Sequence, residues 1–318
     1  MARSLNPIFL AGLGAGAAAA AIATTRALRS APPPDGAVVL VTGGSRGLGY
    51  AIASRFARHP VRLVLAARDR LQLATAQEAL IARYPHLHPQ DFYLVDADLS
   101  NPNECHRLIQ ETLHHFGRID VLVNNAGIID VGPAECHHLD AFYSAMHIHF
   151  YGPLHILWAA LPQLRQQEPM PGWSRRAAIV NIASIGGKIA VPHMLPYTTS
   201  KFALVGLSEG LHAELRKDNI HVTTVCPGLM RTGGEEHACF IGDVDAERRW
   251  FNLSANMPLL SASVEHAACR IYSAVTHGCA EITITPQAWL AARIAGLCPN
   301  TTQRVAALVN EYVLPSAP

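Results

Sequence analysis

A strand-like run that leads directly into a glycine-rich loop and then into a helix constrains the fold of this chain most strongly. The run Val38–Val41 is apolar without polar alternation, which is typical of a strand buried on both faces of a parallel sheet. The loop Thr42–Gly49 follows at once, and Tyr50–Arg58 has the pattern of a helix. Free N–H groups and the positive end of the helix dipole attract phosphate at such a junction. The chain is therefore expected to fold as an α/β protein with a phosphate-binding loop.

The glycines of this loop, Gly43, Gly47 and Gly49, have the spacing G-x-x-x-G-x-G. They would permit the tight turn and the close ligand approach that a Cβ atom blocks. The loop lacks the Gly-Lys-Ser/Thr of a nucleoside-triphosphate site. Taken alone the loop is a weak signal, because a plain turn between a strand and a helix can have the same residues.

Seven strand-like runs alternate with helical stretches along the chain. This order predicts a doubly wound, Rossmann-type sheet of seven parallel strands with helices on both faces. Ligands bind such sheets at the carboxyl ends of the strands. The expected strands are Val38–Val41, Arg62–Ala66, Phe92–Val95, Val121–Val123, Ala178–Ile182, Val222–Val225 and Ile282–Thr285. The residues expected after the first six strands are Gly43, Arg68, Asp98, Asn125, Ser184 and Pro227.

Tyr197 and Lys201 lie four residues apart in an expected helix, so their side chains share one face. A free tyrosine has a pKa of about 10, and a nearby ammonium group lowers that pKa by favouring the phenolate. Tyr197 could then give a proton to a carbonyl oxygen or take one from an alcohol. The same pair also occurs on surface helices without a function. Its meaning here depends on Ser184 at a strand end and on the glycine loop upstream.

In their order along the chain, these motifs resemble the short-chain dehydrogenase/reductase family of the classical type. The resemblance covers roughly residues 36 to 285 and implies hydride transfer between a nicotinamide cofactor and a carbonyl or secondary alcohol. It rests on the glycine loop, Asp98-Leu99, Asn124-Asn125-Ala126-Gly127, Ser184, Tyr197 with Lys201, and Pro227-Gly228 followed by Thr232.

The resemblance also implies residue roles. Ser184 would hold and polarise the substrate oxygen, Tyr197 would be the acid and base, and Lys201 would lie at the nicotinamide ribose. Asp98 and Leu99 would flank the adenine, and Asn125 to Gly127 would back its ribose. The expected cofactor-binding set is Gly43, Ser45, Arg46, Gly47, Leu48, Gly49, Arg68, Asp98, Leu99, Asn125, Ala126, Gly127, Tyr197, Lys201, Pro227, Gly228 and Thr232.

One residue in the expected catalytic set departs from the family pattern. Many members have an asparagine three residues before a glycine in the helix that precedes the serine strand, where it is thought to support a water chain to the lysine. Here His149 stands before Gly152. Because histidine can donate, accept and relay protons, it could substitute with a different pH profile. It could equally mean impaired turnover.

The end of the second expected strand bears on the choice of cofactor. Ala67 occupies the place where an acidic residue would bind the ribose 2′-hydroxyl of NAD, and Arg68 follows it. Arg46 in the glycine loop is a second candidate for a 2′-phosphate, which two arginines can clamp through charge-assisted bonds. The sequence therefore favours NADP(H) over NAD(H). Alternatively, Arg68 caps a helix or pairs with residues near Asp69.

Composition excludes several classes of protein. The 318 residues are 50% hydrophobic and have a formal net charge of +1, which leaves room for one large domain and gives no basic face for nucleic acid. The 7 cysteines are scattered and never form C-x-x-C, which favours a reducing compartment over a disulfide framework or a zinc site. The 17 histidines include no H-x-x-x-H pair with an adjacent glutamate, so no metal site is expected.

Residues 1–35 form an expected appendage before the domain. Ile8–Thr25 is uncharged and apolar, and Arg26, Arg29 and a stiff triple proline follow it. This stretch is just long enough to span a bilayer, and its more basic C-terminal flank would then place the catalytic domain in the cytoplasm. A cleaved targeting peptide and a loosely structured tail are the alternatives.

The rest of the chain divides into an oxidoreductase domain, 36–285, and a C-terminal helical extension, 286–318. Within the domain, Leu229–Ser263 has an irregular pattern, and the family resemblance implies that this segment covers the substrate. The extension has apolar residues at helical spacing and is expected to pack on the domain. It could also shape the substrate mouth, contact a second subunit or lie on a membrane.

Together these patterns predict an NADP(H)-dependent oxidoreductase that acts on a small-molecule carbonyl or alcohol, with a lipophilic substrate favoured. The alternative is a catalytically impaired NADP(H)-binding sensor or membrane-tethered interaction protein, a reading that His149 and the N-terminal segment motivate. The family resemblance further implies a possible homodimer or homotetramer.

Overall fold

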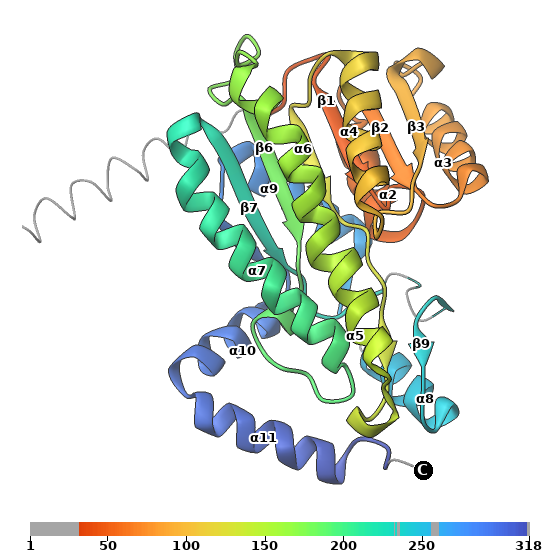
Figure 1. Cartoon of the computed structure of the whole chain (residues 1–318), viewed down its shortest axis with the longest axis vertical. Coiled ribbons are helices and arrows are strands. Elements are labelled where there is room, and N and C mark those ends of the chain that lie inside the picture. Colours follow the sequence, from red (N-terminus) through yellow and green to blue (C-terminus); the bar gives the residue numbers. More distant parts are fainter. Residues whose placement is uncertain (1–31, 232, 234–235, 256–260, 317–318) are drawn as a thin grey trace, which may run out of the picture.

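The computed structural model describes residues 32–231, 233, 236–255 and 261–316. A parallel sheet of seven strands lies at its centre, in the order β11-β7-β6-β4-β1-β2-β3 (Figure 1). The strands are β1 (Val38–Thr42), β2 (Arg62–Ala67), β3 (Phe92–Asp96), β4 (Val121–Asn124), β6 (Ala177–Ile182), β7 (Ile220–Cys226) and β11 (Glu281–Thr283). All seven predicted strands and the predicted fold class are confirmed. The apolar segment 8–25 and Thr232 lie outside the described residues.

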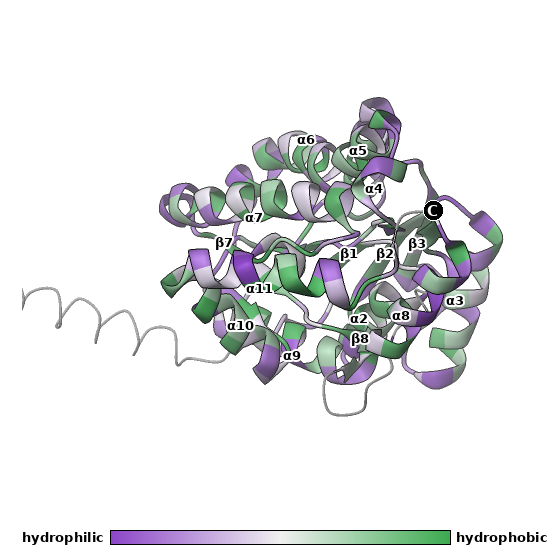
Figure 2. Ribbon diagram, turned by 90° about the horizontal axis from the view of Figure 1, so that it is seen from below, coloured by the Kyte–Doolittle hydropathy of each residue, from purple (hydrophilic) through white to green (hydrophobic). Residues whose placement is uncertain are grey.

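Helices cover both faces of the sheet (Figures 1 and 2). Residues of α2, α3 and α9 pack on one face, where they meet Val39 and Val41, and residues of α4, α6 and α7 pack on the other, where they meet Val38 and Leu40. Because both faces are covered, the first four residues of β1, Val38–Val41, are all apolar. The helices around the sheet are α2 (Gly47–Phe56), α3 (Arg70–Arg83), α4 (Pro102–Phe116), α5 (Leu139–Met146), α6 (Gly152–Gln166), α7 (Leu195–Leu215) and α9 (Val264–His277).

Local sequence signals set several of the helix ends. Asp69 caps α3 by accepting hydrogen bonds from the amides of Leu71 and Gln72. Asn101 caps α4 in the same way, and Gly117 ends that helix with a φ of 75°, a conformation that favours glycine. Between α5 and α6 the helix widens into a π-helical turn, His147–Tyr151, which includes His149.

The segment between β7 and α9 is more regular than predicted. It contains a 12-residue helix, α8 (Val244–Ala255), together with two short strand pairs. One pair is β8 (Met230–Arg231) with β10 (Ala262–Ser263), and the other is β9 (Cys239–Phe240) with β5 (Asp130–Val131). The expectation of an irregular segment is therefore wrong for 244–255, because the apolar residues of α8 are too few and too widely mixed with charge to reveal a helix.

The C-terminal extension consists of α10 (Pro286–Leu297) and α11 (Pro299–Tyr312), which lie below the sheet in Figure 1. Only Ala288 of α10 is buried, and α11 has no buried residue, so the packing on the domain is confined to the start of α10. The exposed large apolar side chains here are Trp289, Leu290, Ile294, Leu297, Val305, Leu308, Val309, Tyr312 and Val313. Among the described helices, none is both long and apolar enough to cross a membrane.

Candidate active site

The glycine loop turns tightly between β1 and α2. Gly43 and Gly47 have φ values of 64° and 54°, a region that favours glycine. A Cβ atom on Gly49 would lie 2.0 Å from the carbonyl oxygen of Gly43, so no side chain fits there. Arg46 precedes α2, and its side chain makes no capping hydrogen bond. The first backbone N–H groups of α2 therefore lack a side-chain cap and can donate hydrogen bonds to phosphate oxygens.

Hydrogen bonds fasten the loop after β4 to the glycine loop. Thr42 Oγ1 accepts from the backbone amides of Asn125 and Ala126, at 2.8 and 3.1 Å, and donates to the carbonyl of Val123. The Asn125 amide group donates to the carbonyls of Thr42, at 3.0 Å, and Gly43. The predicted cofactor residues Gly43, Asn125 and Ala126 are thus brought together at the carboxyl ends of β1 and β4.

At the carboxyl ends of β1, β2 and β3, the predicted residues differ in their exposure. Leu48 and Leu99 are buried in the two hydrophobic cores. Arg46 and Arg68 are exposed, and neither side chain forms a hydrogen bond or ion pair with another described residue. Two hydrogen bonds from Ser100, one from its hydroxyl and one from its amide, hold the pKa of Asp98 below its usual range, and the charge of Arg68 adds to this effect.

Ser184 and Tyr197 meet between the end of β6 and the first turn of α7. The Ser184 hydroxyl oxygen accepts a hydrogen bond from the Gly186 amide at 3.0 Å. The Tyr197 ring lies beside the same hydroxyl, since a Cβ atom on Gly186 would be 3.5 Å from Ser184 Oγ and also close to the phenol. A Cβ atom on Gly186 would lie 3.3 Å from the Tyr197 ring, so the short turn after Ser184 is closely packed against the phenol. A carbonyl oxygen placed here could contact two hydroxyl groups at once.

Lys201 lies one turn further along α7 and is almost fully buried. Its ammonium nitrogen donates to the carbonyl of Ile182 at 2.8 Å and lies 5.6 Å from the centre of the Tyr197 ring. Burial lowers the pKa of Lys201 to about 7. The structure therefore confirms that the two side chains share one face of the helix.

The expected lowering of the tyrosine pKa is wrong for the protein without cofactor. The pKa of Tyr197 is raised, because burial disfavours the phenolate more than the hydrogen bond from Ser184 favours it. Lys201 does not reverse this effect, since its charge is directed at a backbone carbonyl and is itself disfavoured by burial. Tyr197 is thus held as a neutral phenol, the form that can donate a proton.

His149 is buried beside Tyr197, with ring centres 5.4 Å apart and planes at 87°. Its Nε2 atom accepts from the Ile128 amide at 3.1 Å, and its Nδ1 atom is 2.8 Å from Ser200 Oγ. A Cβ atom on Gly127 would lie 2.7 Å from Nε2, so the ring rests directly on this backbone. Burial, and then the charge of Lys201, lowers the pKa of His149 well below its ordinary value.

Pro227 and Gly228 connect the site to the C-terminal extension. The Pro227 carbonyl accepts from the Ile185 amide at 2.7 Å, which fixes the turn after Ser184. A Cβ atom on Gly228 would lie 2.4 Å from the hydroxyl oxygen of Thr285, the N-cap of α10. These two residues thus hold the loop after β7 against both the catalytic turn and α10.

The helix α8 is attached to the loop before Tyr197 by a buried contact that the sequence did not indicate. His193 Nδ1 lies 2.7 Å from Glu247 Oε1, and the side chains are only 4% and 0% exposed. The other carboxylate oxygen of Glu247 accepts from the indole N–H of Trp250. His193 also has a φ of 62°, unusual for a residue other than glycine, and its carbonyl accepts from the Gly132 amide. We call His193, Glu247 and Trp250 the α8 clasp.

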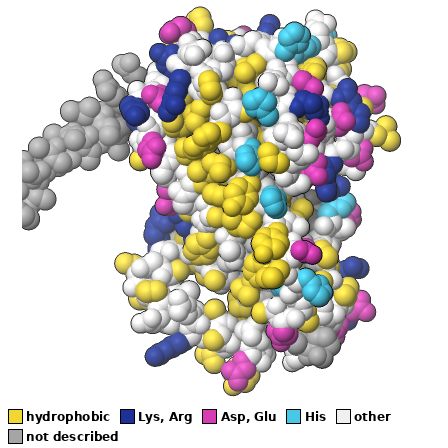
Figure 3. Space-filling view, in the orientation of Figure 1, with side chains coloured by type: hydrophobic (Ala, Val, Ile, Leu, Met, Phe, Trp, Pro, Cys, Tyr) yellow, Lys and Arg dark blue, Asp and Glu magenta, His cyan; other side chains and the backbone are white. Residues whose placement is uncertain are grey.

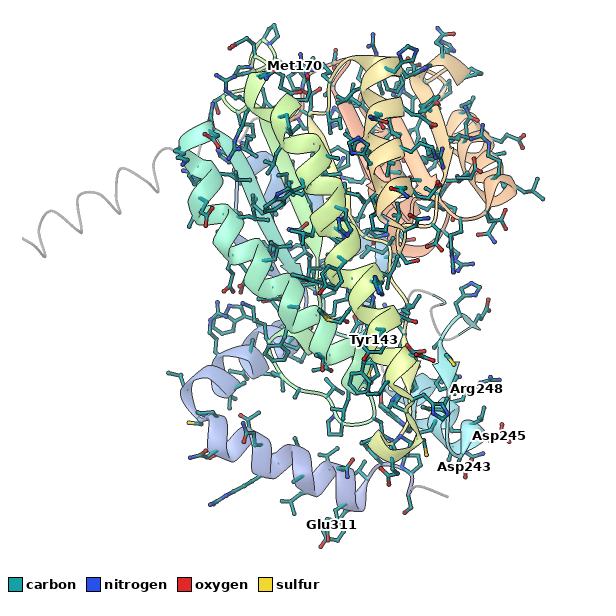
Figure 4. The ribbon with its side chains drawn as sticks, viewed as in Figure 1. Tyr143, Met170, Asp243, Asp245, Arg248 and Glu311 are labelled. Carbon is teal, nitrogen blue, oxygen red and sulfur yellow. The ribbon has the colours of Figure 1, made fainter. Side chains whose placement is uncertain are left out.

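Figure 4 shows the outer side of this helix with Asp245 and Arg248, which are both exposed. Glu247 lies between them in sequence and points inward. One glutamate among several charged residues in a polar stretch gives no sequence signal of its own. Thr42 and Ser200, by contrast, lie within the glycine-loop and Tyr197–Lys201 motifs, and their hydroxyl groups could have been proposed from that position.

The fold and this site define a class of protein: dinucleotide-binding α/β oxidoreductases with a serine, a tyrosine and a lysine at the carboxyl edge of a parallel sheet. The family described as short chain dehydrogenase matches residues 37–238, and the chain belongs to this family.

Named relatives support the assignment. The chain is 34% identical over 204 residues to "Dehydrogenase/reductase SDR family protein 7-like" of Anopheles gambiae, a match of 64% of this chain and 62% of that protein. It is 33% identical to "11-beta-hydroxysteroid dehydrogenase A" of Sesamum indicum, over 80% of this chain and 69% of the relative. The chain thus spans less than two thirds of the mosquito protein's length.

Among solved structures, a short chain dehydrogenase/reductase from Burkholderia phymatum in complex with NAD is similar. It has a TM-score of 0.74 and 25% identity, and the match covers 84% of this chain and 95% of that chain. A levodione reductase has a TM-score of 0.69 and 24% identity, which is a likeness of fold.

Proposed function

We propose that this protein is an NADP(H)-dependent reductase of lipophilic carbonyl compounds, or the dehydrogenase of the corresponding alcohols. The proposal rests on one observation: Ser184, Tyr197 and Lys201 lie together in a fold whose glycine loop leaves no room for a side chain at Gly49. When bound, the cofactor supplies or accepts the hydride. The protein's own groups bind the substrate oxygen and move the proton.

The two hydroxyl groups divide this work. Ser184, fixed by the Gly186 amide, donates a hydrogen bond to the carbonyl oxygen and polarises the bond. As hydride reaches the carbon and negative charge develops on the oxygen, Tyr197 transfers its phenolic proton to that oxygen. The charge left on the phenolate is compensated by Lys201, one turn away. In the reverse direction, the phenolate takes the proton from the alcohol.

Replacement of Tyr197 by Phe tests this role. We expect NADPH oxidation with a carbonyl substrate to fall at least about a hundredfold, the usual contribution of a positioned acid, while NADPH binding is kept. Tyr312→Phe, at an exposed position on α11, is the matched control and should retain full turnover. Unchanged turnover in Tyr197→Phe would refute the proposed mechanism. NADPH binding by the wild-type protein without turnover on any carbonyl would favour the alternative, a cofactor-binding sensor.

The preference for NADP(H) is proposed from Arg46, after β1, and Arg68, after β2, which are exposed and whose side chains form no hydrogen bond or ion pair with the described residues. Arg68→Ala should weaken NADPH binding about tenfold and leave NADH binding unchanged, because it removes one charge-assisted hydrogen bond to the 2′-phosphate. Arg58→Ala, also exposed but at the other end of α2, is the control. An equal loss for both cofactors would contradict the assignment.

The substrate class is proposed from two observations. A relative named as an 11-beta-hydroxysteroid dehydrogenase is 33% identical to this chain. The segment expected to cover the substrate contains a set of packed aromatic rings, with Phe251 lying against both Phe240 and Trp250. We expect steroid-like and other large apolar ketones to have a higher kcat/KM than small polar carbonyls. The opposite order on a matched panel would refute this proposal.

Association with a second copy is proposed from a band of exposed apolar side chains along α5, α6 and α7, visible as the yellow band in Figure 3. Its members are Leu139, Tyr143, Tyr151, Trp158 and Phe202. Trp158 is 59% exposed at the centre of α6, so Trp158→Glu should convert a dimer or tetramer into a monomer in light scattering. A wild-type monomer would refute the proposal.

A cytoplasmic, membrane-associated location is proposed from residues 8–25 and from the exposed apolar side chains of α10 and α11. Figure 2 shows these two helices at the end of the molecule where the strands end. The full chain should float with lipid vesicles, and deletion of residues 1–30 should release it. Flotation that does not depend on residues 1–30 would assign the binding to another surface.

A further inference from the structure

The contacts of His149 fix its protonation state from the geometry. A backbone amide can only donate, so Nε2, which accepts from Ile128, must hold a lone pair. The proton of the neutral ring is then on Nδ1, which donates to Ser200 Oγ at 2.8 Å. Ser200 in turn donates to the carbonyl of Tyr197, also at 2.8 Å. The result is a directed chain of hydrogen bonds from Ile128 through His149 and Ser200 to the backbone of Tyr197.

In this series of hydrogen bonds, neither ring nitrogen of His149 is free. Both ring nitrogens are engaged by protein groups, and the residue is only 1% exposed. A second proton at Nε2 would require the Ile128 amide to turn away, and the ring cannot move toward Gly127 because that backbone is already in contact with it. The nearest cation, Lys201 on α7, also opposes a positive charge on the ring. The Tyr197 phenol ring also lies against the imidazole.

The same contacts show what the ring holds in place. On one side lies the Ala126–Ile128 loop, whose other end is fastened to Thr42. On the other side lies the first turn of α7, where the ring edge meets the Tyr197 phenol at 87°. His149 therefore spans the gap between the predicted cofactor loop and the predicted acid, and the widened turn His147–Tyr151 brings it there.

We infer that His149 is a positioning residue. Its imidazole is permanently neutral and protonated on Nδ1, and it fixes the Gly127–Ile128 loop relative to the helical turn of Tyr197. It carries no proton during turnover. This inference rests on the proposed role of Tyr197. It means that protons reach the Lys201 side of the site by a route that does not pass through position 149.

The first test needs no activity. Nitrogen-15 NMR of the full chain with labelled histidine should show one ring that keeps the neutral Nδ1–H pattern from about pH 5.5 to 8.5, on both sides of the ordinary histidine pKa of ~6.5. His149→Asn removes that signal and so assigns it among the 17 histidines. Titration of the assigned ring in this range, or an Nε2–H pattern, would overturn the inference.

The second test separates positioning from proton relay. The side chain of His149→Asn is shorter than the imidazole and cannot reach both Ile128 and Ser200, so we expect kcat to fall about tenfold, the effect of one buried group left unpaired. The pH dependence of kcat should keep its wild-type shape. Ser200→Ala should lower kcat by a similar factor, and the double variant should be no slower than the slower single variant, because both interrupt one chain.

His147→Asn, at the exposed start of the same turn, is the matched control and should be unchanged. Loss of one limb of the pH profile in His149→Asn, or additive losses in the double variant, would show proton relay and overturn the inference. Tyr197→Phe is measured in parallel. Full turnover in that variant would refute the proposed function, while the NMR result on His149 would still stand.

Discussion

The α8 clasp gives a prediction whose size follows from its burial. Glu247 accepts hydrogen bonds from His193 Nδ1 and Trp250 Nε1, and its side chain is 0% exposed. Glu247→Ala leaves both donors without a partner, and each orphaned group costs about 1–3 kcal/mol. Two such groups together give about 4 kcal/mol as a central value, so we expect the docking of α8 to weaken by about 4 kcal/mol.

Hydrogen–deuterium exchange of the peptide covering 244–255 measures this loss. Because no residue of α8 belongs to the two main hydrophobic cores, α8 should open without unfolding of the domain, and its amides should exchange at least about a hundredfold faster. Glu247→Gln retains one acceptor oxygen and should lie between the wild type and Glu247→Ala. Asp245→Ala, exposed on the same helix, is the control. Exchange of α8 at the wild-type rate in Glu247→Ala would refute this reasoning.

Two further predictions concern the buried centre. Burial lowers the pKa of Lys201 from 10.5 to about 7, so between these pH values the unfolded chain binds more protons than the folded protein. The buried lysine therefore lowers the free energy of unfolding by its full amount below about pH 7, and this loss disappears as the pH approaches 10.5. Lys201→Met should therefore raise the urea midpoint most at or below pH 7, and a gain that does not vary with pH would contradict this. Gly49→Ala places a Cβ atom 2.0 Å from the Gly43 oxygen, so we expect loss of NADPH binding and about 2 kcal/mol or more of stability by urea unfolding. Gly210→Ala on α7, with open space at its Cβ position, should be neutral or stabilising by up to about 1 kcal/mol, and equal behaviour of the two variants would refute the steric argument.

The central sheet could be predicted from the sequence because its strands are covered on both faces. Val38–Val41 has no polar alternation for this reason, and the same holds for most of the other runs. The edge of the sheet at which the site lies could also be predicted, since glycine, asparagine, serine and proline residues follow the strands directly. These residues gather at one edge of the sheet through the parallel pairing of β1, β4, β6 and β7.

Other features depend on contacts that no local pattern records. The raised pKa of Tyr197 results from how deeply the first turn of α7 is buried and from the direction in which Lys201 points. The α8 clasp joins residues 54 positions apart through a single carboxylate. The exposure of α11 likewise could not be read from its helical spacing, since the same pattern suits a helix packed on the domain and a helix that faces a partner.

The bonds between Thr42 and Asn125 join parts of the chain 83 residues apart, and the turn after Ser184 is completed only by Pro227. During synthesis from the N-terminus, the glycine loop therefore leaves the ribosome long before its partners do. A nucleotide cannot assist folding at that stage, because the residues that form its binding site have not yet come together. It can stabilise only chains that have emerged beyond β7, by the mass-action effect of a ligand on a folded state. Cofactor supply in the cell would thus change the yield of completed protein and leave the early steps of folding untouched.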